Sequence, residues 1–285
     1  MKLAVISRHG NVGLAAIDAD GNARALFEGD AGYCGDVDEI IARGASAVEA
    51  AKSALVDAPL VPSGDFTYLP VVQNPGKIIC VGLNYSDHAA EGGMEVPEFP
   101  TIFARFASGL VGHGADLLIP PESDKFDYEG ELAVVIGTGG RRISKERALD
   151  HVAGYSIFND ASVRDFQLRT PQWTLGKNFD HTGAFGPCLV TPDDLPAGAT
   201  GLKIETRLNG EVVQSSNTGK LIFDVATLIH DLSIAMTLSA GDVIITGTPA
   251  GVGAVRTPPL WMKPGDLCEV EIEGLGVLAN PVRAE

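Results

Sequence analysis

The stretch DYEGELAVVI, residues Asp127 to Ile136, decides the fold because two acidic residues lead directly into an apolar, β-branched run. Such a run is typical of a buried strand. Side chains alternate between the two faces of a strand, so Glu129 and Glu131 point the same way and Gly130 leaves the opposite face bare. The sequence therefore predicts a strand that carries two carboxylates into a core on one face.

This pair of glutamates has two interpretations. Carboxylates that enter a core on one face are costly to bury unless a positive charge lies between them. Hard divalent cations such as Mg²⁺, Ca²⁺ and Mn²⁺ prefer carboxylate oxygens, so a metal site is one solution. The alternative is a strand whose first residues are still in water, with both glutamates solvated. The spacing alone leaves both interpretations open.

Composition and charge limit the partners of this chain. Its 285 residues are 45% hydrophobic and 20% charged, which is ordinary for a globular protein of one or two domains. Lysine and arginine total 21 against 37 for aspartate and glutamate, and the resulting formal charge of −16 argues against a nucleic-acid partner. A small anionic substrate is compatible with this charge, because a metal ion and a few arginines can set the local field. No apolar run approaches the ~18 residues that span a bilayer, so we expect no membrane partner.

The N-terminus and the cysteines predict a cytoplasmic location. The first apolar run is broken at Ser7 and Arg8, too early for a signal peptide. The cysteines lie far apart and form no CxxC pair, at positions Cys34, Cys80, Cys188 and Cys268. Scattered thiols of this kind fit a reducing cytoplasm.

The first 70 residues are expected to form a small N-terminal α/β unit. It should contain three short strands and one long helix, at Leu3–Ser7, Leu14–Asp18, Ala25–Phe27 and Asp36–Leu55. A connection rich in proline follows and ends at Pro70. We therefore expect two domains, at residues 1–70 and 71–285.

The second domain is expected to be rich in strands. Candidate strands lie at residues 78–82, 101–106, 131–136, 152–159, 188–191, 203–208, 243–246 and 268–272. Helical patterns are fewer, at residues 84–91, 162–168 and 223–236. Strands that follow one another without regular intervening helices argue against a doubly wound parallel sheet. The expected fold class is α+β, with many antiparallel strands.

Asp160, Arg164 and Gln167 follow the predicted strand at 152–159 and form a polar stripe. The structural role of Asp160 would be that of a helix N-cap, where aspartate is preferred. A plain amphipathic helix would more often fill this face with leucine or valine. If Asp160 joined Glu129 and Glu131, three carboxylates would hold a divalent ion with positions left for water and substrate. Arg164 would then be able to pair with a substrate carboxylate.

Lys177 lies in the stretch WTLGKNFD at residues 173–180. This stretch lacks the glycine spacing and the Ser/Thr of a Walker A loop. A lysine beside bulky apolar residues often extends to the surface, whereas one held near a metal ion would stabilise a developing oxyanion. On these residues alone, the surface position is favoured.

His88 and Glu91 are spaced to touch on a short helix. A carboxylate beside a histidine fixes the imidazole tautomer and raises its basicity, which suits the activation of a water molecule. The glycines at 92 and 93 would let this segment hinge as a lid. The alternative is an ordinary surface ion pair.

A glycine-rich loop at residues 247–253 follows the predicted strand at 243–246. It lacks the GxGxxG order and the following helix of a dinucleotide-binding fold, which argues against a nicotinamide cofactor. Its backbone N–H groups and the Thr248 hydroxyl would be able to cradle a carboxylate. A tight structural turn is an equal alternative.

Together these segments resemble the fumarylacetoacetate hydrolase (FAH) superfamily, and in particular its acylpyruvate hydrolase-like members. Five segments occur in the family's order: CVGLNY followed by His88, DYEGEL at 127–132, ND and RD between 159 and 165, GK followed by Asp180, and GTPAGVG at 247–253. The resemblance covers about residues 73–285.

The resemblance implies an FAH-type mixed β-sandwich-roll catalytic domain, usually a homodimer, with Mg²⁺ or Mn²⁺ in the site. By position, the metal ligands fall on Glu129, Glu131 and Asp160. The water-activating pair falls on His88 and Glu91, and the oxyanion-stabilising lysine on Lys177. Substrate-binding positions fall on Arg164, Gln167 and Thr248, with Tyr85 and Arg105 as weaker candidates.

The resemblance implies an enzyme that acts on a small oxo acid, for example in aromatic catabolism. The leading hypothesis is hydrolysis of a C–C bond in a 2,4-dioxo acid such as fumarylpyruvate, which gives pyruvate and a carboxylic acid. The metal would chelate the substrate, His88 would activate water, and Lys177 with Gln167 would steady the oxyanion.

The sequence leaves two alternatives open. The first is a decarboxylase or isomerase of an oxo-dicarboxylic acid, of the oxaloacetate or unsaturated 2-oxo-dioate type, at the same metal site. The second is a non-catalytic protein in which the ion only holds a β domain together. The second would show a closed coordination sphere and a large loss of stability on chelation.

Overall fold

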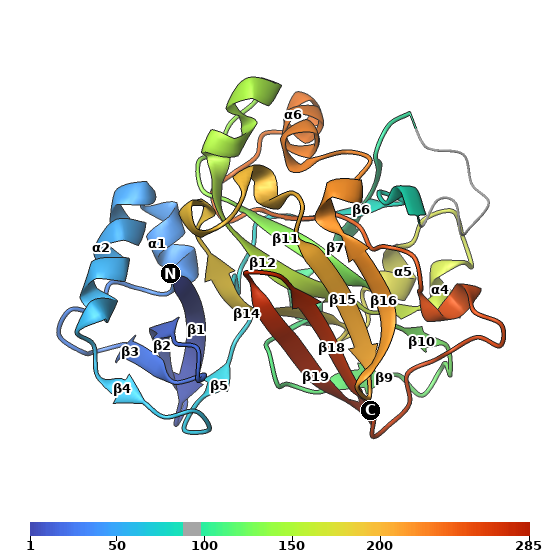
Figure 1. Ribbon diagram of the computed structural model, residues 1–285, viewed down its shortest axis with the longest axis horizontal. Helices are drawn as coiled ribbons and strands as arrows, with labels where there is room; N and C mark the ends of the chain where they lie inside the picture. The colour runs from blue at the N-terminus through green and yellow to red at the C-terminus, as the bar shows by residue number, and fades with distance from the viewer. Residues whose placement is uncertain (88–97) are drawn as a thin grey trace.

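The computed structural model describes residues 1–87 and 98–285 and shows an α+β protein built mainly from strands (Figure 1). Among the described residues, the larger sheet has twelve strands. Ten of them follow the order β4 (Leu60–Val61), β3 (Ala23–Phe27), β2 (Asn11–Ile17), β1 (Lys2–Arg8), β14 (Gly183–Val190), β12 (Val152–Asp160), β11 (Gly130–Ile136), β17 (Val243–Ile245), β6 (Ile78–Gly82) and β7 (Thr101–Arg105). The other two, β5 (Thr67–Tyr68) and β8 (Leu110–Val111), pair with β1 and β14.

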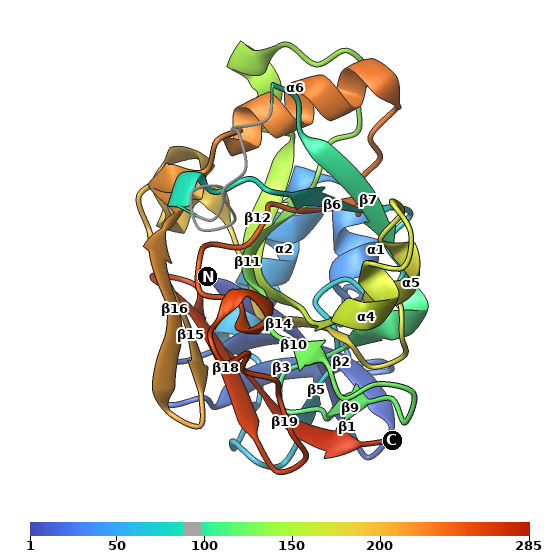
Figure 2. The same ribbon diagram turned by 90° about the vertical axis from the view of Figure 1, so that its right-hand side faces the viewer.

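A second sheet packs on one face of this sheet, and two N-terminal helices, at residues 37–42 and 45–56, pack on the other face. Its strands follow the order β16 (Glu211–Asn217), β15 (Lys203–Leu208), β18 (Leu267–Ile272), β19 (Gly276–Ala284) and β9 (Leu117–Ile119). A short pair joins β10 (Phe126–Asp127) to β13 (Ser162–Val163). In the described part of the chain, the α-helices are α1 (Val37–Ala42), α2 (Ala45–Val56), α4 (Arg164–Gln167), α5 (Thr174–Lys177) and α6 (Val225–Ala235). Figure 2 shows α5 beside β7 with α4 below it, and α1 and α2 are seen through the space between β11 and β7.

The alternation of β11 explains this layering. Leu132 and Val134 belong to the core shared with the second sheet, whereas Ala133 and Val135 belong to the core that includes α1 and α2. Gly130 lies on the face toward the second sheet, where an added Cβ would approach the Thr206 Oγ1 atom to 2.3 Å. The bare face that the sequence predicts at Gly130 is therefore the face on which the second sheet lies.

The N-terminal strands continue the main sheet, because Leu3 of β1 pairs with Leu189 of β14. The domain boundary near residue 70 stays a prediction.

The single helix expected at Asp36–Leu55 is wrong, because the chain turns at Gly44, whose φ of 89° favours glycine, and forms two helices. In the part of the chain described here, no helix is long and apolar enough to cross a membrane.

Candidate active site

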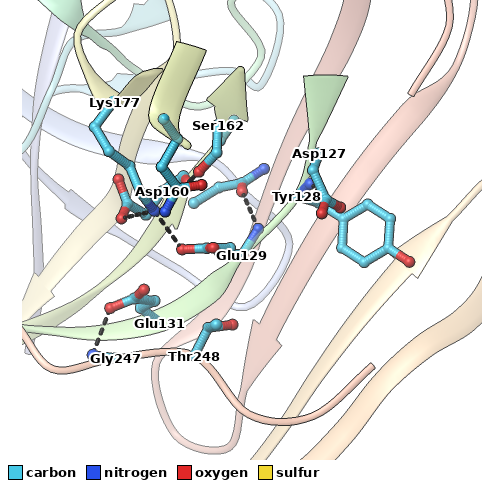
Figure 3. A network of polar contacts seen from close by, with 12 residues as sticks. Asp127, Tyr128, Glu129, Glu131, Asp160, Ser162, Lys177, Gly247 and Thr248 are labelled. Atoms are coloured by element: carbon cyan, nitrogen blue, oxygen red, sulfur yellow. Dashed lines mark hydrogen bonds and ion pairs between the residues drawn. The ribbon is translucent and has the colours of Figure 1, made fainter. Parts of the chain in front are cut away.

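The pairing of β11 with β12 brings three carboxylates together. The strands are antiparallel with Glu131 opposite Phe158, and the Asp160 N–H donates to the Glu129 carbonyl at 2.9 Å. Glu129 and Asp160 are therefore cross-strand neighbours, and Glu131 follows on the same face as Glu129. One carboxylate oxygen from each of the three residues lies within 4.8 Å of the others, and all three side chains are buried. Figure 3 shows this cluster.

Asp160 was expected on a helix with Arg164, and this expectation is wrong. Asp160 is the last residue of β12, two residues of β13 follow, and α4 begins only at Arg164. Asp160 thus reaches the glutamates through strand register instead of a shared helix face.

Three cations surround the carboxylates. The Lys177 Nζ atom lies 2.6 Å from both Glu129 Oε2 and Asp160 Oδ2 (Figure 3). The Arg164 Nη1 atom lies 2.6 Å from Glu129 Oε1, and Arg105 pairs with Asp160. The surface position favoured for Lys177 is wrong, because the residue is only 1% exposed. The backbone before Lys177 lies directly against α4, because Gly176 has no side chain there. A Cβ at Gly176 would lie 2.2 Å from the backbone nitrogen of Gln167.

These contacts set the protonation of the cluster. Burial and the charges of Asp160 and Glu129 hold the pKa of Glu131 well above its usual range. Burial also opposes ionisation of Glu129, but Lys177 and Arg164 outweigh it and lower the pKa of this carboxyl. Burial opposes the charge on Lys177, but Asp160 and Glu129 outweigh it and raise the pKa of the amine. Lys177 is therefore an ammonium that donates hydrogen bonds, and it is a poor base.

The carboxylate cluster fits a hard divalent ion. Three oxygen-donor residues converge within one ligand-sized space, and oxygen is the donor that Mg²⁺ and Mn²⁺ prefer. The flanking cations reduce the repulsion between the carboxylates, which would otherwise oppose their burial.

The glycine-rich loop after β17 is bonded to the same strand. The Gly247 N–H donates to Glu131 Oε2 at 2.5 Å, and the Thr248 hydroxyl donates to the Gly130 carbonyl at 3.0 Å. Gln214 of β16 donates to the Thr248 hydroxyl at 2.8 Å and accepts from the Gly130 N–H at 3.0 Å. Gln214 was not predicted from the sequence, and its amide links the second sheet to the loop and to β11.

A cavity of about 260 Å³ adjoins the carboxylates. Its charged and polar lining includes Glu129, Glu131, Arg164, Gln167, Lys177 and Thr248. Its apolar side includes Phe103 and Trp173, whose rings meet edge to face at 5.4 Å between centroids. Trp173 packs on Gly82, where an added Cβ would lie 2.4 Å from the indole ring. A second cavity of about 280 Å³, near α2, contains none of these charged residues.

The remaining candidates from the sequence lie in other places. Arg105 is 3% exposed, is not among the residues that line the cavity, and donates to Thr182 Oγ1 at 2.7 Å. Tyr85 is buried, and its hydroxyl has no hydrogen-bond partner within residues 1–87 and 98–285. His88 and Glu91 lie outside the described residues, so their roles stay predictions.

Comparison with known proteins agrees with this architecture. A family profile described as "Fumarylacetoacetate (FAA) hydrolase C-terminal" matches residues 77–283. The chain is 46% identical over 246 residues to "Oxaloacetate tautomerase Fahd2a, mitochondrial" of Rattus norvegicus, covering 86% of this chain and 78% of the relative. Among solved structures, "Fumarylacetoacetate hydrolase (EaFAH)" of Exiguobacterium antarcticum has a TM-score of 0.86 at 36% identity and full coverage of both chains.

A second solved structure carries a different activity in its name. It is "5-carboxymethyl-2-hydroxymuconate delta-isomerase" of Mycobacterium smegmatis, with a TM-score of 0.78, 32% identity, and coverage of 100% of this chain and 99% of that one. The names of similar proteins thus include both hydrolase and isomerase.

The expected cytoplasmic location is contradicted by these comparisons. The relatives from rat, cattle and human are all named mitochondrial. The expectation rested partly on free cysteines, and the four thiols are indeed unpaired. Free thiols report a reducing environment but do not distinguish between compartments that share it.

The profile match over most of the chain, the identity to FAH-domain relatives and the shared fold agree with the carboxylate cluster described above. This chain is an enzyme of the fumarylacetoacetate hydrolase superfamily.

Proposed function

We propose that this chain is a divalent-metal-dependent tautomerase or isomerase of a short 2-oxo dicarboxylic acid of the oxaloacetate type. The observation that carries the proposal is the buried carboxylate triad beside one small cavity, which two of its members, Glu129 and Glu131, line together with Arg164 and Lys177. The names of the rat tautomerase and the mycobacterial isomerase support this class over the hydrolysis of a 2,4-dioxo acid.

The size and charge of the cavity favour a short dianion. At about 260 Å³ the cavity lies below the range of about 300–1,000 Å³ that is typical of sites for drug-sized ligands. Arg164 lines it, and the Arg164 Nη2 atom is buried without a hydrogen-bond partner in the described parts of the chain. A buried guanidinium N–H group without a partner is costly, and a substrate carboxylate would supply that partner.

Glu129, Glu131 and Asp160 would hold Mg²⁺ or Mn²⁺, which when bound would polarise the 2-oxo group of the substrate. Lys177, held as an ammonium, would donate a hydrogen bond to the enolate oxygen as negative charge develops there. Phe103 and Trp173 would exclude water from the opposite side of the cavity and strengthen these interactions.

Tautomerisation moves a proton between C3 of the substrate and the 2-oxygen. We propose that His88, oriented by Glu91, carries this proton, since their sequence spacing would let the two side chains touch on a short helix. The same pair would activate water in a C–C hydrolase, so its presence does not separate the two reactions.

The test is the decay of enol-oxaloacetate, followed by its ultraviolet absorbance after dilution into buffer. We expect the purified protein with Mg²⁺ or Mn²⁺ to accelerate ketonisation without producing pyruvate. Excess chelator and the Asp160→Asn variant should each remove the acceleration. Pyruvate release from fumarylpyruvate, without faster ketonisation of oxaloacetate, would instead support the hydrolase.

A further inference from the structure

Asp127, the last residue of β10, is a buried carboxylate whose two oxygens both accept hydrogen bonds from other parts of the chain. It is fully buried and accepts four hydrogen bonds. Its Oδ1 atom accepts from the backbone N–H groups of Tyr128 at 2.9 Å and Gly253 at 2.8 Å. Its Oδ2 atom accepts from the Ala254 N–H at 2.9 Å and from Arg164 Nε at 2.8 Å. Figure 3 shows Asp127 apart from the three clustered carboxylates.

Two of these four bonds join parts of the cavity lining that come from different elements. Arg164 belongs to α4, while Ala254 belongs to the turn that follows the glycine-rich loop, and both residues line the cavity. The turn approaches so closely that a Cβ at Gly253 would lie 2.6 Å from Asp127 Oδ1 and 1.8 Å from the Leu260 carbonyl oxygen. Asp127 itself is not among the residues that line the cavity.

Asp127 also limits how Arg164 can turn. The Nε atom is held by Asp127, and Nη1 donates to Glu129 Oε1 at 2.6 Å and to Gln167 Oε1 at 2.9 Å. Because the guanidinium is planar, fixing Nε and Nη1 also fixes the position of Nη2. Nη2 is the nitrogen that has no partner in the described residues.

We propose that Asp127 is a positioning residue: it fixes the Arg164 guanidinium and the Gly253–Ala254 turn against each other, so that Arg164 Nη2 receives a carboxylate of the substrate. Asp127 does not touch the substrate in this arrangement. The proposal rests on the proposed function, in which the substrate is a short dicarboxylate. Arg164 binds one carboxylate of the substrate, and Asp127, which does not line the cavity, holds Arg164 in the orientation that this requires.

The Asp127→Asn variant tests this arrangement selectively. With the amide oxygen toward Tyr128 and Gly253, the amide nitrogen faces Ala254 and Arg164, and donors then oppose donors. Arg164 loses a charge-assisted bond that holds its orientation, so KM for oxaloacetate should rise about tenfold to a hundredfold. We expect kcat to change less than about threefold, since the carboxylate is bound equally in ground and transition states.

A double-mutant cycle separates positioning from general damage. In an Arg164→Gln background, Asp127→Asn should add little to KM, because the group that it positions is already gone. The matched control is Asp165→Asn, on the same helix, whose carboxylate accepts from Ser123 Oγ at 2.6 Å and should leave KM unchanged. If Asp127→Asn does not fold, Asp127→Ser removes the bond to Arg164 without opposing donors and should raise KM in the same way.

Binding of malonate, a non-reacting dicarboxylate, keeps the test independent of turnover. Isothermal titration calorimetry on the metal-loaded protein should show binding to the wild type that Asp127→Asn weakens about tenfold or more. If the wild type has no tautomerase activity, the proposed function fails, and this titration still decides the role of Asp127. Equal malonate affinity in wild type and variant, no malonate binding by the wild type, or additive effects in the cycle would each overturn the proposal.

Discussion

Replacement of Lys177 by methionine keeps the length of the side chain and removes the ammonium that lies 2.6 Å from Glu129 and Asp160. In the metal-free protein this leaves two buried carboxylates with one counter-charge fewer. Removal of one partner of a buried ion pair costs about 3–5 kcal/mol, and we expect the lower end because Arg105 and Arg164 remain. For a chain of 285 residues, ~3 kcal/mol corresponds to a fall of about 5 °C in the unfolding midpoint.

Although Lys177→Met should be less stable than the wild type without metal, it should bind a divalent ion more tightly. A divalent ion supplies the missing positive charge and no longer meets an ammonium between two of its ligands. We therefore expect Lys177→Met to bind Mg²⁺ or Mn²⁺ on the order of tenfold more tightly than the wild type. Turnover should nevertheless fall by about 10²–10³-fold, because the donor to the enolate oxygen is lost.

Thermal unfolding with chelator and with metal, together with calorimetric metal titration, measures both effects. The matched control is Lys203→Met, whose Nζ lies 2.7 Å from Glu205 Oε2 on the surface with the lysine side chain 62% exposed. That change should alter stability by less than about 1 kcal/mol and leave metal affinity unchanged. A Lys177→Met protein that is as stable as the wild type in chelator, and that binds metal no more tightly, would refute the account of this cluster.

Three further predictions concern the ligands, the proton carrier and the cavity wall. Glu131→Gln should abolish metal-dependent turnover and weaken metal binding in calorimetry, and wild-type activity in this variant would remove Glu131 from the ligand set. His88→Ala should slow the metal-dependent ketonisation of enol-oxaloacetate by about 10²–10⁴-fold, because the group that carries the proton is lost, and an unchanged rate would contradict this role. Trp173→Ala should widen the cavity beside Gly82 and shift kcat/KM toward 2-oxo acids with longer chains by about 10–200-fold, and an unchanged preference would place the substrate elsewhere.

The strands that the sequence predicted have either a continuous apolar run, as in β6 and β17, or apolar residues at alternate positions, as in β15. β6, β15 and β17 lie at or within one residue of their predicted limits, because their side chains enter a core. β14 begins at Gly183 instead of Cys188, since two glycines and Pro187 hide its first half. β19 contains Pro281 and was missed for the same reason.

Local sequence patterns alone predicted the site only where strand alternation determines it, and Asp160 and Lys177 were added to it by the resemblance to the FAH superfamily. Glu129 and Glu131 share a face because of strand periodicity, and any sequence with this spacing would give that result. The position of Asp160 depends on the register between β11 and β12, which local sequence does not encode. The burial of Lys177 likewise depends on the packing of Gly176 against α4.

Two residues that organise the site were not predicted. Asp127 begins the acidic stretch at 127–131. The signal that could have identified it is its position two residues before Glu129, in a stretch that was already predicted to carry two buried carboxylates. Gln214 lies on β16, a polar strand without a periodic apolar pattern, and contacts the loop only through sheet packing. Both act across long sequence separations, which a single sequence read locally does not reveal.

The most direct test of the central claim is the exchange of the C3 hydrogens of oxaloacetate with D₂O, followed by proton NMR. We predict that the protein with Mg²⁺ or Mn²⁺ accelerates exchange without consuming oxaloacetate, and that chelator or Asp160→Asn abolishes this effect. Unaccelerated exchange, with pyruvate formed from an acylpyruvate under the same conditions, would contradict the account and identify a C–C hydrolase.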